Sequence, residues 1–448
     1  MLKSVEKVSL EFLKVSKERP IRIIGNQSTD GICAIAILIK TLQKLDKKFS
    51  TKAIKALSNE IIEKEFQRDT NEIFIFCGLD PKNFFENKTS HKTFLFYNQK
   101  TENIPEEIIA LNPTNNEDPL ENYCTSAGIA YLFSKEISQE LQFLSDVAVI
   151  GMIGTEYDPT RSTTNKIIIE DSFNLTIKKG ITLYPATRPI KRTLEYSTSP
   201  YIQGITGNGT GVLRLLEELQ ISQEKNILDL SEEEIAKLST AIKSRQAQHS
   251  SSEEIYGDIF VLNFFNTKED VRELAVLINS CSHLGKSDVA IEYCLGNSKS
   301  KKEALEIYTR YNHELVSALK IAEKIEKMEG KGFTIINAGD QIKEGVIGTV
   351  CSVISSSPAY EEGTVFVGMA QNNDGQTKIT ARISGRVGRN VKEMFEKTLQ
   401  NFRETHPETK ADVGGNKYAA GCFIESIHEP AFIENLQKVL EIEEIKIH

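Results

Sequence analysis

The chain has 448 residues, of which 40% are hydrophobic and 26% are charged, and its formal net charge is −9. This length exceeds what a single hydrophobic core serves, so we expect two or three domains, and the composition excludes extended disorder. Because acidic residues are in excess, any attraction to nucleic acid must come from a local basic patch.

The cysteines and the apolar segments indicate a cellular compartment. Seven cysteines are spread singly along the chain, which is typical of a reducing compartment and argues against a zinc ribbon or a disulfide framework. The apolar run near the start is much shorter than the roughly 20 residues of a membrane-spanning helix, and the first residues lack a signal peptide's apolar stretch. We therefore expect a soluble, cytoplasmic protein with no membrane role.

The first third of the sequence alternates strand-like and helix-like segments. The opening segment places Val5, Val8, Phe12 and Val15 on one helical face before Pro20, which predicts a helix packed on the following domain. Strands are expected at 21–25, 72–76, 93–97 and 147–154, with helices from about Gly31 and over 125–135. This alternation predicts an α/β fold with a mostly parallel sheet covered by helices on both faces.

The middle of the chain is expected to be mainly helical. A capping box at Ser231 and Glu234 opens one of its helices. The glycine-rich run GITGNGTG (204–211) lacks GxGxxG spacing and a Walker lysine, so we interpret it as a structural turn. Strands return at 333–337, 364–370 and 378–384, followed by a helix at 391–402. This pattern predicts a separate C-terminal α/β domain.

Ligands of open α/β sheets bind beyond the carboxyl ends of the strands, so the residues that follow the predicted strands are the first candidates for a site. The first strand is followed by Asn-Gln-Ser-Thr-Asp-Gly at 26–31. This run lies where DHH-superfamily phosphoesterases such as RecJ carry His-x-Asp-x-Asp-Gly, and only Asp30 and Gly31 match.

The wider sequence resembles the archaeal RecJ-like branch of that superfamily, which includes the GINS-associated nuclease and the archaeal counterparts of the eukaryotic cell-division-cycle helicase cofactor. Six fragments, in the same order, carry the resemblance: LNPTNNEDPLENYCTSAGIAY, SPYIQGITGNGTG, IYGDIFVLNFFN, ELAVLINSCSHLGKSDVAIEYCLG, KITARISGRVGRNVKE and VGGNKYAAGC. The resemblance implies a DHH-type domain with the opening helix over 1–185, a mainly helical region over 186–330 and a DHH-associated α/β domain over 331–448.

Enzymes of this family hold two divalent metals, usually manganese, which polarise a phosphate and activate a water. The resemblance matches eight positions of this chain to the family's metal-binding motifs: Asn26, Ser28, Asp30, Gly78, Tyr97, Asn98, Gln99 and Thr155. Asp30 is the one charged residue among these eight. Amides and hydroxyls lack the charge that concentrates two divalent cations at short range. We therefore expect a degenerate site without catalytic residues and without a metal cofactor.

Four acidic residues leave an alternative open. Asp30, Asp80, Glu156 and Asp158 follow the predicted strands and are weak candidates for one hard cation, manganese or magnesium. An Asp at a strand-to-helix turn is also a good N-cap with a favourable helix-dipole interaction. We favour this capping role for Asp30.

Basic residues gather between positions 378 and 392. Lys378 and Arg382 share one face of a predicted strand, which makes them the best candidates for a phosphate contact, although a charge run is usually a solvated face. The resemblance implies that a nucleic-acid surface is formed by Lys378, Arg382, Ser384, Arg386, Gly414, Gly415 and Asn416. Asn416 stands in place of the histidine of the family's Gly-Gly-His.

The kept fold and the lost metal ligands favour a catalytically silent structural component of the archaeal replication machinery that binds GINS and, through it, the MCM helicase. Two alternatives stay open. One is an active manganese-dependent single-strand exonuclease or phosphoesterase with a metal site rebuilt from the remaining acids. The other is a single-stranded DNA-binding module without catalysis, which could coexist with the structural role.

Overall fold

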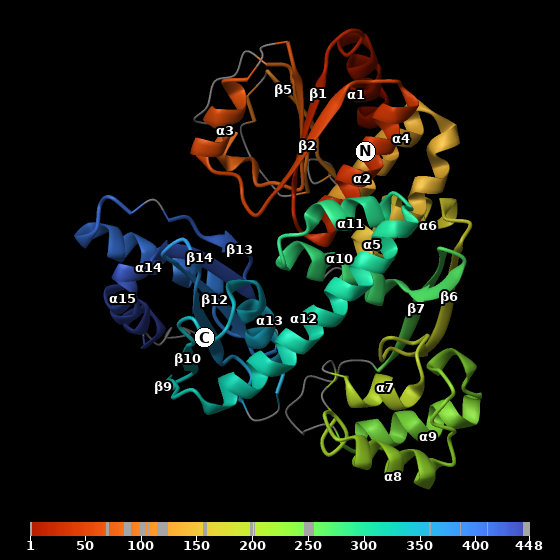
Figure 1. The fold of residues 1–448 in the computed structure, drawn as a ribbon, viewed down its shortest axis with the longest axis vertical. Helices are drawn as coiled ribbons and strands as arrows, with labels where there is room; N and C mark the ends of the chain where they lie inside the picture. Colours follow the sequence, from red (N-terminus) through yellow and green to blue (C-terminus); the bar gives the residue numbers. More distant parts are fainter. Residues whose placement is uncertain are drawn as a thin grey trace, which may run out of the picture. The chain divides into compact units, whose positions relative to one another are not determined.

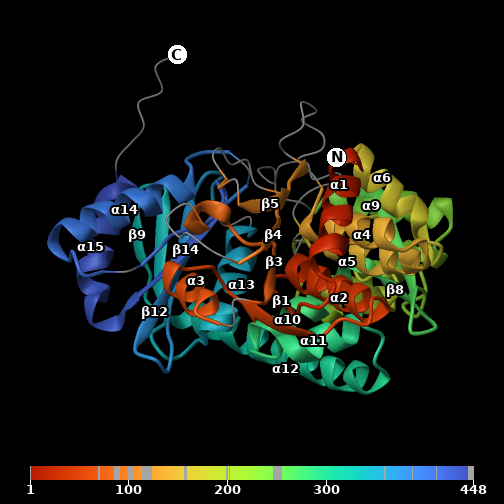
Figure 2. The same cartoon turned by 90° about the horizontal axis from the view of Figure 1, so that it is seen from above.

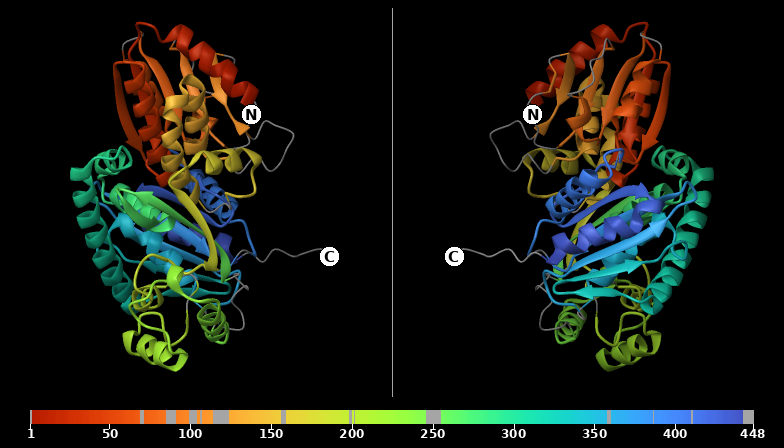
Figure 3. Two further views of the ribbon diagram at one scale, coloured as in Figure 1. Left: turned by 90° about the vertical axis from the view of Figure 1, so that its right-hand side faces the viewer. Right: turned by 90° about the vertical axis from the view of Figure 1, so that its left-hand side faces the viewer.

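The computed structural model describes residues 2–68, 71–84, 91–98, 104–105, 107–113, 124–155, 159–197, 200, 202–245, 255–357, 360–385, 387–409 and 411–441. The chain divides into two compact units, Met1–Lys178 with Asp258–Tyr308 (unit 1) and Lys179–Gly257 with Thr309–His448 (unit 2). The chain changes units after Lys178, after Gly257 and after Tyr308. The last of these points lies inside the long helix α12 (Ser298–Lys324), shown in teal in Figure 3. The three-domain division at residues 185 and 330 stays a prediction.

Unit 1 is built on a five-stranded sheet in which every neighbouring pair of strands is parallel. The order across the sheet is β2-β1-β3-β4-β5, with bounds Phe49–Ile54, Ile21–Asn26, Ile73–Cys77, Thr93–Phe96 and Ile108–Leu111. The predicted α/β class with a parallel sheet is therefore confirmed.

Helices cover both faces of this sheet, as Figures 1 and 2 show. The helices α1 (Leu2–Val15), α2 (Thr29–Lys44) and α4 (Ser126–Ile137) pack into a core on one face, and α3 (Asn59–Phe66) packs on the other. Successive side chains of a strand enter opposite cores, which is why the strands read as continuous apolar runs. The carboxyl ends of the strands meet at one edge, where a site is expected.

The opening helix packs on the sheet as predicted. Val5, Val8 and Phe12 are buried. The Phe12 ring meets the rings of Phe94 and Phe133 edge-on, at centroid distances of 5.4 and 5.2 Å. These contacts tie α1 to the core formed by the sheet and α4.

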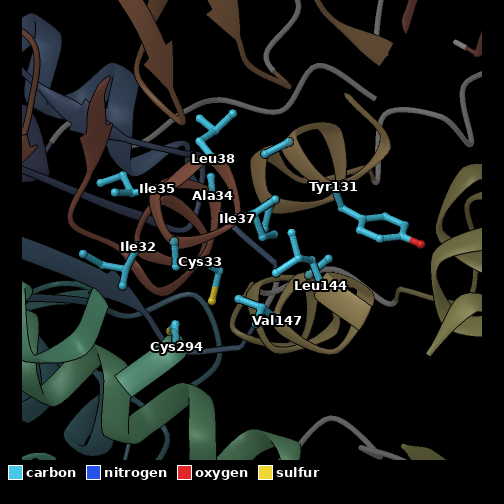
Figure 4. Packing of buried hydrophobic residues seen from close by; sticks show 14 of the residues in the cluster. Ile32, Cys33, Ala34, Ile35, Ile37, Leu38, Tyr131, Leu144, Val147 and Cys294 are labelled. Carbon is cyan, nitrogen blue, oxygen red and sulfur yellow. The ribbon is translucent and has the colours of Figure 1, made fainter. Parts of the chain in front are cut away.

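The strand predicted at 147–154 is wrong, because the helix α5 (Ser145–Ile153) occupies this segment. Every side chain from position 145 to 152 is buried, so the segment has no polar face and its sequence lacks helical periodicity. A short apolar run of this kind cannot be told from a buried strand by its pattern. Figure 4 shows Val147 of α5 in the same cluster of buried side chains as Cys33 and Ile37 of α2.

A smaller sheet, in the order β6-β7-β8, follows later in the chain. Its strands are Leu175–Ile181, Tyr256–Phe264 and Thr267–Asp270. The helix α6 (Thr163–Asp171) precedes it, and α10 (Val271–His283) and α11 (Ser287–Cys294) follow it and join the unit 1 core.

The segment between β6 and β7 contains the helices α7 (Ile190–Glu195), α8 (Gly209–Leu219) and α9 (Glu232–Lys243). The predicted capping box at Ser231 and Glu234 opens α9. The glycine-rich run is a turn at the start of α8.

Unit 2 contains a six-stranded sheet in the order β13-β14-β12-β11-β10-β9. Its strands are Gly414–Gly415, Ala419–Glu425, Gln376–Ile383, Val365–Gln371, Phe333–Asn337 and Met328–Gly330. The helices α14 (Val391–Thr405) and α15 (Glu429–Glu441) share a core with one face of this sheet. On the other face α13 (Glu344–Ser355) approaches Gly368 so closely that an added Cβ there would lie 2.3 Å from the Cys351 Sγ.

Among the residues described, none of the helices combines the length and the apolar character that crossing a membrane requires.

Candidate functional site at the strand ends

The first candidate residues form a tight turn between β1 and α2. The Asn26 Oδ1 accepts the backbone N–H of Ser28 at 2.7 Å, and the Asn26 Nδ2 donates to the Lys55 carbonyl at 3.1 Å. The Ser28 Oγ accepts the N–H of Gly31 at 3.3 Å. Ser28 is therefore the N-cap of α2, and the prediction that Asp30 caps this helix is wrong.

Asp30 reaches a different helix. It is partly buried in the first turn of α2, and its Oδ2 accepts the N–H of Ser126 at 2.9 Å while its Oδ1 accepts the N–H of Ala127 at 2.8 Å. These amides belong to the first two residues of α4. Burial raises the pKa of the Asp30 carboxyl above its ordinary value, although the amides of Ala127 and Ser126 act in the opposite direction.

Gly78 follows β3 and lies beside this turn. Its φ of +67° favours glycine. A Cβ added to Gly78 would lie 3.4 Å from the Ser126 Oγ, 3.5 Å from the Asn26 Cβ and 3.6 Å from the Gly31 Cα. The structure thus brings Asn26, Gly31 and Gly78 together with the start of α4.

The remaining predicted positions lie in other surroundings. Tyr97 is 1% exposed and belongs to the apolar cluster on the α3 face of the sheet, and Asn98 after it is partly buried. The Thr155 Oγ1 donates to the Met152 carbonyl at 2.7 Å, just after α5 ends. Asp80 is partly buried two residues beyond Gly78. Gln99, Glu156 and Asp158 lie outside the described residues.

The donors near Asp30 do not fit the two-metal centre that the resemblance implies. Each oxygen of its carboxylate already accepts an amide of α4, and the neighbouring positions carry amide and hydroxyl groups. Within the described part of the chain, no group of three or more His, Cys, Asp or Glu side chains could hold a metal ion.

Sequence reasoning missed the backbone partners of this turn on other helices. Two are the amides of α4. Two more are carbonyls of α10, where the Gln27 Nε2 donates to the Ser282 carbonyl at 3.2 Å and the Thr29 Oγ1 donates to the Ala275 carbonyl at 3.0 Å. The signal available for α4 was its own N-cap, since the Thr125 Oγ1 accepts the N–H of Gly128. That signal locates the helix start but not the side chain that reaches it.

The predicted nucleic-acid residues on β12 lie against α13. The Lys378 Nζ donates to the Glu344 carbonyl at 2.9 Å. The Arg382 Nε donates to the Ser352 Oγ at 3.0 Å, and its Nη1 donates to the Thr380 Oγ1 at 3.0 Å. Both cations therefore have partners within unit 2.

The other residues predicted to contact nucleic acid lie after β12 and in the turn at β13. Ser384 is 7% exposed, and Arg386 lies outside the described residues. Gly414, Gly415 and Asn416 form an exposed turn, in which the Asn416 Oδ1 accepts the amides of the residues at 418 and 419. The assignment of these residues to nucleic acid stays a prediction.

Comparison with known proteins places the fold. Residues 184–257 match the family model described as the DHH-CID domain. CDC45 from Entamoeba histolytica is similar with a TM-score of 0.69 at 11% identity, over 98% of this chain and 99% of that one. RecJ from Thermus thermophilus, in complex with Mn²⁺, is similar with a TM-score of 0.60 at 15% identity, over 99% of this chain and 55% of that one. The chain has the fold of the RecJ-like DHH superfamily.

The chain spans about 55% of the length of the Thermus RecJ that it matches. It is also 26% identical to an uncharacterized protein of Methanocaldococcus jannaschii over 370 residues, which cover 79% of this chain and 81% of that protein. The resemblance to RecJ-like DHH proteins that the motifs indicated is confirmed.

Proposed function

We propose that this protein is a catalytically silent structural component of the archaeal DNA replication machinery, which binds GINS and, through it, the MCM helicase. The observation that carries the proposal is the Asp30 carboxylate, which accepts two amides of α4, while Asn26, Ser28 and Gly78 beside it are uncharged. The similarity to CDC45 over nearly the whole chain supports a retained fold. The GINS and MCM partners come from the motif resemblance.

Charge explains why hydrolysis is not expected. Two divalent ions held side by side repel each other strongly, and in metal-dependent phosphoesterases carboxylates offset this repulsion. At the matching positions this chain carries amide and hydroxyl side chains, which offer only dipoles, and glycine, which has no side chain. The repulsion between two bound cations would therefore not be offset by negative charge. The protein therefore acts without a metal cofactor.

The partner is tested by mixing the purified protein with GINS from its own organism and separating the mixture by size exclusion. Co-elution in a defined complex is expected, and adding MCM should shift that complex to larger size. An unrelated acidic protein of similar size serves as the control for charge-driven association. Separate elution of the protein and GINS at micromolar concentration would count against the proposal.

Catalysis is tested with labelled single-stranded DNA, RNA and a dinucleotide in millimolar manganese, with an active RecJ as the positive control. No turnover is expected. Hydrolysis that disappears in Asp30→Ala, while that variant stays folded, would establish the alternative, an active exonuclease or phosphoesterase with a rebuilt metal site.

Single-stranded DNA binding is a second candidate, favoured by the exposed turn at Gly414–Asn416, which is followed by exposed Lys417. Binding through Arg382 would weaken with added salt and in Arg382→Ala. Because the Arg382 side chain also contacts Ser352, Ser352→Ala is the matched control: it removes that bond and keeps the charge. A similar loss of affinity in both variants would assign Arg382 to packing rather than to DNA.

A further inference from the structure

We propose that Asp30 is a structural cap between helices: its carboxylate joins the start of α2 to the start of α4, and the positive end of α4 supplies the counter-charge that a metal ion would otherwise provide. The inference deepens the proposed function and rests on it in one respect, namely that the strand-end site works without metal. It also explains why this acid remains where the other expected ligands are neutral.

The geometry divides the capping of α4 between two side chains. Asp30 accepts the first two amides of the helix, at 2.9 and 2.8 Å, from 96 and 97 residues away in the sequence. Thr125, the local N-cap, accepts the third amide, that of Gly128, at 3.2 Å. Since the first amides of a helix have no partner within it, this pair of side chains satisfies most of the first turn.

The negative charge of the Asp30 carboxylate also suits its position at the start of α4. The N-terminus of a helix carries a partial positive charge, and a carboxylate there is stabilised most when it is partly shielded from water. Helix α4 has 12 residues, so the aligned peptide dipoles extend over several turns. Asp30 thereby finds a partial counter-charge inside the fold, which offsets part of the effect of its burial.

A third helix also approaches the carboxylate. Gly151 of α5 lies on its other side, where an added Cβ would be 3.4 Å from the Asp30 Oδ1, 3.1 Å from the Cys33 Cβ and 2.5 Å from the Ala127 Cβ. Three helices thus converge on one side chain. A divalent ion needs several oxygen ligands at about 2.0 to 2.6 Å, and the neighbouring positions Asn26, Ser28 and Gly78 add no second carboxylate to that of Asp30.

The contacts of the Asp30 carboxylate argue against two simpler roles. A cap for its own helix is unnecessary, because Ser28 accepts the N–H of Gly31 and fills that role. A role as a leftover metal ligand alone would not account for both oxygens accepting amides of α4.

The test uses the full-length protein and amide hydrogen exchange. In the wild type the amides of Ser126 and Ala127 should be protected, and in Asp30→Ala this protection should fall at least tenfold. Ser28→Ala is the matched control, because it removes a cap from the same turn and should expose the Gly31 amide while leaving 126 and 127 protected. If Asp30→Ala does not fold, Asp30→Asn, which keeps one acceptor, should show a partial loss at the same two amides.

Metal provides the second readout. Millimolar manganese should leave the thermal midpoint of the wild type unchanged, while Asp30→Ala without metal should unfold roughly 4 °C or more below it. Unchanged protection at 126 and 127 in Asp30→Ala would overturn the inference. So would a manganese-dependent rise of the midpoint that occurs in the wild type and is lost in Asp30→Ala. Failure to bind GINS would refute the proposed function and leave these readouts unaffected.

Discussion

Glu65 is a buried carboxylate that is satisfied differently from Asp30. Its oxygens pair with the Arg22 Nε at 3.0 Å and the Lys52 Nζ at 2.8 Å, so cations of β1 and β2 hold the end of α3. Glu65→Ala would leave Arg22 buried without this partner. We expect the free energy of unfolding to fall by about 3 kcal/mol, as measured by urea denaturation.

The matched control is an exposed ion pair in the same unit. Lys44 and Glu140 are 43% and 75% exposed at their side chains, and pairs of this kind contribute little in water. Glu140→Ala should therefore change the free energy of unfolding by less than about 1 kcal/mol. Equal losses in the two variants would contradict the argument from burial.

The same carboxylate predicts a pH dependence. Burial alone would raise the pKa of Glu65, but Arg22 and Lys52 lower it below its ordinary value of 4.5. The unfolded chain then binds a proton more readily than the folded one, so this contribution to stability is present above pH 4.5 and is lost as pH falls through the lower folded pKa. Glu65→Gln should flatten the stability curve below that pH. A curve as steep as that of the wild type would contradict the assignment.

At the candidate site, the sequence indicated the location but not the contacts. The strand-end turn and the position of Asp30 followed from the strand pattern, because open sheets place ligands there. The partners at 126 and 127 did not, since they lie 96 and 97 residues away and the approach depends on how α2 and α4 pack. The alternation of side chains along β12 correctly placed Lys378 and Arg382 on one face of the strand. It could not show that α13 covers this face.

Among the elements, prediction succeeded where polar residues mark a boundary and failed where they do not. The strand at 333–337 was predicted with the bounds that β10 has, and the capping box of α9 was recognised from Ser231 and Glu234. The wrong element is α5, whose residues are buried on all sides. The helix α5 is buried because α2 and α4 pack against it, and this packing cannot be predicted from the residues of α5 alone.

The capping box gives a testable contribution to α9. The Ser231 Oγ accepts the N–H of Glu234 at 3.2 Å, and the Glu234 Oε2 accepts the N–H of Ser231 at 2.8 Å. Ser231→Ala should lower the free energy of unfolding by about 1 kcal/mol. Ser244→Ala, at the other end of the helix, should have a smaller effect. Loss of helical signal in the second variant and not in the first would contradict this assignment.

The glycine turn at β13 offers a second test with a matched control. A Cβ added to Gly415, at φ +125°, would lie 2.2 Å from the Ala419 carbonyl oxygen, whereas nothing lies within 4 Å of one added to Gly414. Gly415→Ala should therefore lower the free energy of unfolding by about 2 kcal/mol, and Gly414→Ala by less than about 1. Similar stabilities would contradict the backbone argument for Gly415.

At the scale of the whole molecule, the segment that matches the DHH-CID domain is an insertion between two paired strands. The N–H of Asn263 bonds the Asn174 carbonyl and the N–H of Thr182 bonds the Ile255 carbonyl, so β6 and β7 run antiparallel and the two ends of the insertion meet. The helices α7, α8 and α9 pack chiefly on one another. Such an insertion can be removed with little effect on the strands that flank it.

We therefore expect a protein in which residues 182–255 are replaced by Asn-Gly to keep its fold. A two-residue turn matches the antiparallel pairing of β6 and β7, so the sheet and the core of unit 1 should persist. Cooperative urea unfolding should remain, with a smaller m-value because less surface is exposed on unfolding. A protein in which a long Gly-Ser linker replaces the same residues is the control for the turn. It should fold with lower stability, because closing a longer flexible loop costs more conformational entropy. A non-cooperative transition in both proteins would show that the rest of the fold, in unit 1 or in the remainder of unit 2, depends on the insertion.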